Sequence, residues 1–131
     1  MKRIIVICEG ATEREFCEKT LYPHFISKNI FIQAPLIKKS MGGIVKWSEL
    51  KKQISLHLKN EPNAYVTTLI DYYGLYAKYE FPQWEDSLKI LDKNNRMDFL
   101  ETAMTNDFDE GIKYRYLICN SMSLKVYYLM R

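Results

Sequence analysis

The feature of this sequence that most limits its fold is an unbroken apolar run near the start, Ile4-Ile-Val-Ile-Cys8, which ends at Glu9. A strand with one face in water alternates apolar and polar side chains, whereas a strand covered on both faces is apolar throughout. Most of this run is also β-branched, which favours extended backbone. The run therefore predicts a strand buried on both faces, as in a parallel sheet.

Helical and extended patterns alternate after this strand. The sequence predicts, in order, a helix over residues 13–27, a strand over 29–38, an amphipathic helix over 45–59 and a strand over 65–70. Strand, helix, strand, helix, strand is the order of an α/β fold in which helices flank a parallel sheet, with right-handed crossovers.

Three local signals set the expected boundaries. Thr12, with Glu15 three residues later, forms a capping box and predicts the start of the first helix. Pro23 is expected to kink or divide that helix, because proline has no N–H to donate. Pro35 interrupts the second strand and predicts an edge position or a bulge.

The pattern is less regular beyond Tyr73. Helices are expected over residues 84–93 and 96–105, and a strand over 114–119. The sequence contains no internal repeat and no low-complexity segment.

Composition limits the class of protein. The 131 residues suffice for about one domain, and a hydrophobic fraction of 47% suffices for a core. The net charge of +3 fits a nucleic-acid binder and an indifferent surface equally well. The three cysteines lack CxxC spacing and are interpreted as reduced thiols. No stretch approaches the roughly 20 apolar residues of a membrane span, so we expect a cytoplasmic protein.

Acidic residues follow two of the predicted strands directly. Glu9 ends the first strand, Asp71 ends the third, and Glu13 lies in the first turn of the expected helix. The carboxyl ends of parallel strands meet at one edge of a sheet, so these carboxylates are expected to gather there. Like charges held together are unfavourable unless a cation neutralises them, and a hard ion such as Mg²⁺ prefers carboxylate oxygens.

Each of these carboxylates also has a purely structural interpretation. Glu13 can stabilise the start of a helix through the helix dipole. Asp71 can form the turn before Tyr72-Tyr-Gly74, a frequent use of aspartate. Glu9 has no obvious structural need, and spacing by itself leaves the metal site and the structural interpretation both open.

The residues around Glu9 resemble a known motif. The segment Val6-Ile-Cys-Glu-Gly-Ala-Thr-Glu13 resembles the first motif of Toprim domains, in which a glutamate ends the first strand. Its Glu-x-x-x-Glu spacing is similar to that of nucleases of the overcoming-lysogenization-defect (OLD) type.

A wider set of motifs resembles one Toprim-like bacterial family, the domain-of-unknown-function family 4276. The motifs are Cys-Glu-Gly-x-Thr-Glu from Cys8, Leu21-Tyr-Pro-His24, Gly42-Gly43 before Lys46-Trp47, and Val66-Thr-Thr-Leu-Ile-Asp-Tyr-Tyr-Gly74 followed by Phe81-Pro82. The resemblance extends from Lys2 to about Phe108, and it depends on the motifs in combination. It implies a Toprim-like (Rossmann-like) α/β fold.

The resemblance also implies a function. Glu9 would be a general acid/base or a metal ligand, and Glu13 and Asp71 would be ligands of Mg²⁺ or Mn²⁺. A metal-activated water would attack a phosphodiester in nucleic acid. The family resemblance further implies a role in defence against phages or mobile DNA, beside an ATPase partner. The alternative function is a non-catalytic interaction module that binds a partner protein or nucleic acid.

Lysines surround the Gly42-Gly43 loop. Lys38, Lys39 and Lys46 are candidate contacts for a nucleic-acid backbone, although a solvated loop explains any single lysine equally well. The tyrosines at 72, 73, 76 and 79 suit either stacking on bases or packing of the domain.

Two features depart from the family pattern. The second Toprim motif is Asp-x-Asp, whereas Asp71-Tyr72-Tyr73 supplies one carboxylate. The family also carries a His-Glu-Phe-Glu type of segment after its fourth strand, which this chain lacks. We therefore expect residues 1–113 to form an incomplete Toprim-like domain and residues 114–131 to be a non-native tail.

A shifted reading frame is the leading explanation for that tail. Codons permitted for residues 121–129 spell His-Glu-Phe-Lys-Gly-Leu-Leu-Phe in another frame, which resembles the missing segment. The expected consequence is a truncated chain without activity, and the nucleotide sequence of the gene tests this hypothesis.

Overall fold

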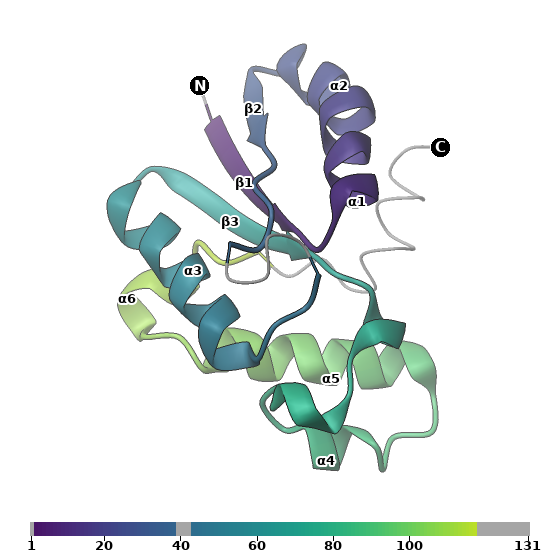
Figure 1. The fold of residues 1–131 in the computed structure, drawn as a ribbon. Coiled ribbons are helices and arrows are strands. Elements are labelled where there is room, and N and C mark those ends of the chain that lie inside the picture. The colour runs from purple at the N-terminus through teal and green to yellow at the C-terminus, as the bar shows by residue number, and fades with distance from the viewer. Residues whose placement is uncertain (1, 39–42, 118–131) are drawn as a thin grey trace.

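The computed structural model describes residues 2–38 and 43–117, which form a three-stranded parallel sheet with helices on both faces (Figure 1). The strands are β1 (Lys2–Cys8), β2 (Ile30–Gln33) and β3 (Ala64–Leu69), in the order β2-β1-β3. The central strand β1 is the apolar run at the start of the sequence. The predicted α/β fold with a parallel sheet flanked by helices is confirmed.

The two faces of β1 belong to different parts of the core. Ile5 and Ile7 point to one face and Val6 and Cys8 to the other, and all four side chains are buried. Side chains alternate across a strand, so a run without polar residues supplies apolar contacts to both faces. This is why β1 occupies the centre of the sheet.

A single helical stretch covers the face that contains Val6 and Cys8. It consists of α1 (Ala11–Phe16), a π-helical segment (Cys17–Leu21) and α2 (Tyr22–Ile26). The predicted capping box is wrong, because the helix begins at Ala11 and Gly10 is its N-cap. Thr12 is already inside the first turn and its hydroxyl does not cap the helix.

The π-helical segment lies immediately before Pro23. In this segment the Tyr22 N–H donates to the Cys17 carbonyl, one residue further back than in an α-helix. Pro23 has no N–H to donate, so the regular ladder cannot continue through it. The predicted interruption therefore takes the form of a wider turn, and the chain remains helical on both sides.

The opposite face of the sheet is covered by α3 (Trp47–Asn60), α5 (Lys93–Asn106) and α6 (Glu110–Lys113). The predicted amphipathic spacing of α3 is confirmed by its buried apolar residues, Trp47, Leu50, Ile54 and Leu58. Short 3-10 turns (Tyr72–Gly74 and Ala77–Tyr79) and the four-residue α4 (Trp84–Ser87) connect β3 to α5.

Two predicted elements are shorter in the structure. The strand over 29–38 ends at Gln33 at the edge beside β1, and pairing resumes only as a bridge between Leu36 and Cys8 beyond Pro35. The helix over 84–93 ends at Ser87 and continues as three-residue turns to Ile90. Asp92 then caps the next helix by accepting from the Asn95 N–H at 2.9 Å.

The end of the described chain lies beside β3. Tyr116 forms a parallel bridge with Val66, and its side chain is buried against Phe108. The remainder of the strand predicted over 114–119 lies outside the described residues. The non-native origin of the tail also stays a prediction. Within residues 2–38 and 43–117, no helix combines the length and apolar character of a membrane span.

Candidate carboxylate site at the ends of β1 and β3

The sheet order places the site at the point where the chain changes its winding direction. From β1 the chain passes to β2 on one side and then crosses over to β3 on the other. In open α/β sheets the crevice at such a switch point, outside the carboxyl ends of the strands, is where ligands bind. Glu9 follows β1 directly, and Asp71 lies two residues beyond the end of β3.

Glu9 is held against the segment that follows β3. Its N–H donates to the Leu69 carbonyl at 3.0 Å, and its Oε2 atom accepts from the Asp71 N–H at 3.2 Å. The other oxygen, Oε1, lies so close to Gly74 that a Cβ there would be 3.5 Å away. The predicted positions of Glu9 and Asp71 at neighbouring strand ends are therefore confirmed.

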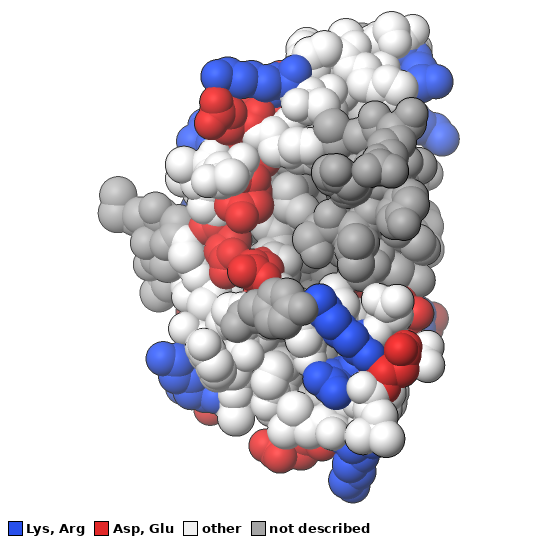
Figure 2. Space-filling model, turned by 90° about the vertical axis from the view of Figure 1, so that its right-hand side faces the viewer, with Lys and Arg blue, Asp and Glu red and all other residues white. Residues whose placement is uncertain are grey.

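Glu13 joins them from the first helix. Its Oε2 atom would lie 3.3 Å from a Cβ at Gly10, so the carboxylate folds back over the loop that leaves β1. Gly10 permits this approach because it has no side chain. Figure 2 shows acidic side chains gathered in a band on one face of the molecule.

The electrostatics of Glu9 reflect this crowding. Burial raises the pKa of the Glu9 carboxyl above its ordinary value, and the charges of Glu13 and Asp71 raise it further. The hydrogen bond from the Asp71 backbone acts in the opposite direction. Carboxylates held this close together favour either protonation of one of them or the binding of a cation.

The donor chemistry of the three side chains fits a hard divalent ion. All their donor atoms are carboxylate oxygens, the type that Mg²⁺ selects. In the described part of the chain, no group of three or more His, Cys, Asp and Glu side chains is arranged to hold a metal ion. Mg²⁺ is usually held by one or two carboxylates and several waters, and Glu9 and Asp71 can supply that number.

Both ends of the lysine-rich loop are attached to the exit of β1. The Ile37 N–H donates to the Cys8 carbonyl at 3.1 Å, and the Gly43 N–H donates to the Glu9 carbonyl. The loop between them begins at Lys38, whose side chain is exposed and whose N–H donates to Gln53. Lys39 lies outside the described residues. The loop thus starts and ends beside Glu9.

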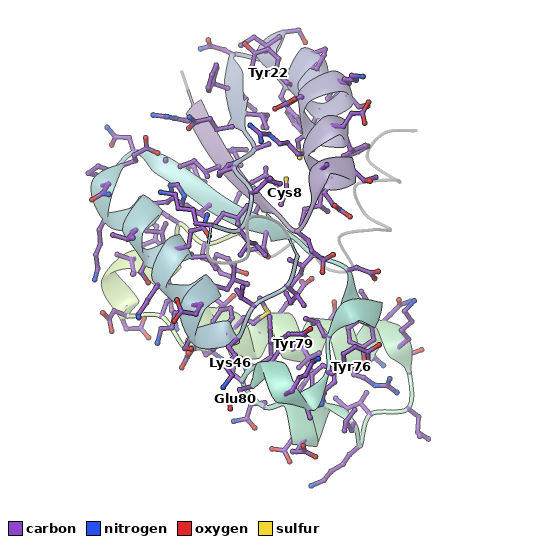
Figure 3. All side chains as sticks on the ribbon, viewed as in Figure 1. Cys8, Tyr22, Lys46, Tyr76, Tyr79 and Glu80 are labelled. Carbon is purple, nitrogen blue, oxygen red and sulfur yellow. The ribbon has the colours of Figure 1, made fainter. Side chains whose placement is uncertain are left out.

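Lys46 lies at the start of α3 and forms an exposed ion pair with Glu80 at 3.6 Å. Figure 3 shows these two residues beside Tyr79 and Tyr76. The Tyr76 and Tyr79 rings are 6.4 Å apart, and the Lys78 ammonium lies 5.2 Å from the Tyr79 ring. Sequence reasoning missed Glu80, because its contact with Lys46 joins segments far apart in the chain.

The fold and the site define an α/β domain with a carboxylate cluster at a topological switch point. Residues 8–124 match the family model described as Domain of unknown function (DUF4276), and the chain belongs to this family. No curated protein and no solved structure matches the chain.

Proposed function

We propose that this chain is a Toprim-like domain of a Mg²⁺-dependent nuclease or phosphotransfer protein that acts on nucleic acid. The observation that carries the proposal is the contact between Glu9 and the Asp71 segment at the ends of β1 and β3, with Glu13 folded toward them. This position is the usual ligand crevice of open α/β sheets.

Each carboxylate has a specific role in this proposal. Glu9 and Asp71 hold the ion, and Glu13 adds negative charge from the helix start. A bound Mg²⁺ supplies stabilisation of the charge that develops on phosphate oxygens. Glu9 is also the general acid/base, since a carboxyl with a raised pKa exchanges protons more readily near neutral pH.

The lysine-rich loop and the start of α3 supply candidate contacts for a nucleic-acid backbone. Lys38 and Lys39 belong to the loop that begins and ends beside Glu9, and Lys46 follows it at the start of α3. Tyr76 is more than half exposed and its ring lies 6.4 Å from that of Tyr79, so a base can stack there. Lysines bind phosphate and tyrosines bind bases, so the two together suit a single strand.

The cellular role follows from the family resemblance. We propose a cytoplasmic function in defence against phages or mobile DNA, with an ATPase as partner. Because Asp71-Tyr72-Tyr73 carries one carboxylate, we propose that this 131-residue chain binds a cation but turns over little or no substrate.

Metal titration tests the proposal directly. We expect Mn²⁺ or Mg²⁺ to bind the wild-type protein in isothermal titration calorimetry, and binding to be lost in Glu9→Gln and Asp71→Asn. The matched control is Glu18→Gln on the same helical stretch, where Glu18 pairs with Arg14 at 3.1 Å away from the strand ends. The proposal would be overturned if the wild type did not bind the ion. It would also be overturned if Glu9→Gln and Asp71→Asn bound the ion as tightly as the wild type does.

The chemistry itself is tested on a longer family member. Replacement of the glutamate equivalent to Glu9 by glutamine should abolish Mg²⁺-dependent cleavage of DNA or RNA while the fold stays intact. Normal cleavage after that change would show that the catalytic role of Glu9 is assigned wrongly.

A non-catalytic interaction module is the second candidate. The observation that favours it is a group of exposed apolar side chains between α4 and α5, where Leu91 is 93% exposed and Leu88 is 49% exposed. Exposed apolar side chains in one place are typical of a binding surface. This module requires no divalent ion, so the same titration separates the two functions.

A further inference from the structure

Two cysteines lie in contact directly behind the carboxylate site. The Sγ atoms of Cys8 and Cys17 are 3.8 Å apart, and both side chains are fully buried. Cys8 is the last residue of β1, and Cys17 is the first residue of the π-helical segment. Figure 3 shows Cys8 between the sheet and the first helix.

The two sulfur atoms are in van der Waals contact. A disulfide requires an S–S distance of about 2.05 Å, so bond formation brings the sulfurs closer by about 1.7 Å. A rotation of the Cys17 side chain together with a shift of its helical turn would provide this approach. That turn is π-helical, and π-helical turns are frequent at functional sites.

The two thiols differ in their readiness to react. The hydrogen bond from Cys8 lowers the pKa of the Cys17 thiol, although burial opposes this effect. Cys17 is therefore the attacking thiol, and Cys8, whose sulfur lies 3.8 Å away, is the resolving thiol.

Cys17 borders a cavity, but its side chain has no exposed surface, so a small oxidant reaches the sulfur when the wall of this cavity opens. This residue lines a cavity of about 250 Å³, together with Glu18, Tyr22, Ile32 and Ala34. Its outer wall is formed by the exposed Glu18 and the half-buried Tyr22 of the first helix. A peroxide molecule is small enough to enter a cavity of this size.

We propose that Cys8 and Cys17 form a reversible disulfide that closes the chain into a ring around Glu9 and Glu13. Hydrogen peroxide is the oxidant. The Cys17 thiolate attacks one peroxide oxygen and the O–O bond breaks. The hydroxide that leaves takes up the proton that the Cys17 thiol had released, so the sulfenic acid of Cys17 and one water form. The Cys8 sulfur then attacks the sulfur of the sulfenic acid, whose hydroxyl leaves with the Cys8 thiol proton as a second water. The two sulfurs lose two electrons and the peroxide oxygens gain them.

The ring acts on the site through the backbone. It contains the exit of β1 and the first turns of the helix, the segment that determines where Glu9 and Glu13 lie relative to each other. A cross-link between Cys8 and Cys17 restricts this segment at both ends. The oxidation state of the pair therefore controls the mobility of the loop, whether or not the carboxylates bind metal.

Peptide mapping tests the bond in the wild-type protein. Trypsin cleaves after Arg3, Arg14 and Lys19, so Cys8 and Cys17 fall in the separate peptides 4–14 and 15–19. After treatment of the folded protein with hydrogen peroxide, we expect these two peptides to be linked, and dithiothreitol to release them. Cys17→Ala is the matched variant, in which peptide 4–14 should remain unlinked.

Cys119→Ala removes the third cysteine and is a further control. The link between peptides 4–14 and 15–19 should form in this variant as it does in the wild type. Loss of the link in Cys119→Ala would overturn the proposal. So would irreversible oxidation of Cys8 or Cys17 without a linked peptide, or no reaction at all.

Amide hydrogen exchange tests the effect on the loop. We expect slower exchange over residues 9–16 in the oxidised protein than in the reduced protein, with α3 as the unchanged reference. Equal exchange in both forms would contradict the restricted loop. Neither measurement involves metal or cleavage, so its outcome is independent of the proposed function.

Discussion

The Oε2 atom of Glu9 accepts a hydrogen bond at 3.2 Å from the backbone N–H of Asp71, a residue 62 positions further along the chain. The contact exists because β1 and β3 are parallel neighbours, with Cys8 opposite Leu69 in the sheet. Each carboxylate thus leaves its strand at the same end, and the pairing of two buried strands creates the acidic site.

Replacement of Glu9 by glutamine should stabilise the metal-free protein at neutral pH. The pKa of Glu9 is raised in the folded state, so wild-type stability falls as the pH rises through that pKa and the carboxyl ionises. Glutamine still accepts the Asp71 N–H but carries no charge. We expect Glu9→Gln to be more stable by roughly 0.5 kcal/mol at pH 7, measured by urea unfolding, with no gain below about pH 4.

The control for this change is Glu18→Gln, which loses an exposed ion pair with Arg14 and should gain no stability. A loss of stability in Glu9→Gln at pH 7 without metal would show that repulsion between the carboxylates is not the dominant effect.

Arg115 should make a large contribution to stability. Its buried guanidinium donates to the carbonyls of Leu58, Glu61 and Ala64 at 2.6, 3.0 and 2.9 Å, and so joins the end of α3 to the start of β3. Arg115→Met leaves these carbonyls without this donor, which we expect to cost about 3 kcal/mol in urea unfolding.

Lys113→Met is the matched control for Arg115→Met. Lys113 pairs with the exposed Glu110 at 2.9 Å, so we expect a change within about 0.5 kcal/mol. A cost below about 1 kcal/mol for Arg115→Met would contradict the role assigned to its hydrogen bonds.

Two apolar residues of α3 should respond very differently to truncation. Ile54 is fully buried against the sheet, whereas Leu56, two residues later, is 56% exposed. Ile54→Ala should lower the free energy of unfolding by about 2 to 5 kcal/mol, because it leaves a cavity in the core. Leu56→Ala should change it by less than about 0.5 kcal/mol. Similar costs for both variants would contradict the orientation of α3.

The indole of Trp47 should contribute through its polar atom as well as its rings. Its Nε1–H donates to the Asp107 carboxylate at 2.7 Å, and the ring packs against Phe81 and Phe108. Trp47→Phe keeps an aromatic ring but removes the donor, with an expected cost of about 2 kcal/mol. A double-mutant cycle with Asp107→Ala isolates the hydrogen bond, and additive effects would exclude a net contribution from it.

His57 should make stability depend on pH. Burial is the main cause that lowers the pKa of His57, and Lys38 and Arg3 add to it while Glu61 opposes it. The unfolded chain therefore binds the proton more tightly, and stability is lost as the pH falls below about 6.5. In His57→Gln, the midpoint of urea unfolding should depend less on pH between pH 7 and pH 5 than it does in the wild type. An unchanged pH profile in that variant would assign the dependence to other groups.

The main elements of this protein follow from local patterns in its sequence. The apolar run 4–8 predicts a strand covered on both faces, and the three- and four-residue spacing of Trp47, Leu50, Ile54 and Leu58 predicts α3. These patterns depend on residues close together in the chain, where the period of the backbone sets which side chains share a face. The sequence also predicted that Glu9 and Asp71 lie at neighbouring strand ends, since the carboxyl ends of parallel strands share one edge of the sheet.

Local signals were weaker where neighbouring segments decide the outcome. The capping box at Thr12 does not form, because the helix starts two residues earlier, at Ala11, with the extended Gly10 as its N-cap. The helix predicted over 84–93 stops at Ser87, where the guanidinium of Arg96 holds the Ile90 carbonyl and Asp92 begins α5. Helix propensity extends through such residues, but the cap at Asp92 and the contact of Arg96 with Ile90 begin a new helix instead.

Contacts between segments far apart in the chain follow only from the packing of the folded protein. It brings Lys46 to Glu80, Cys8 to Cys17 and Arg115 to the end of α3. These contacts depend on how helices pack against the sheet and on which rotamer each side chain adopts. Neither is encoded in the local period of the sequence, because the free energy of a contact depends on both partners and on the water removed between them.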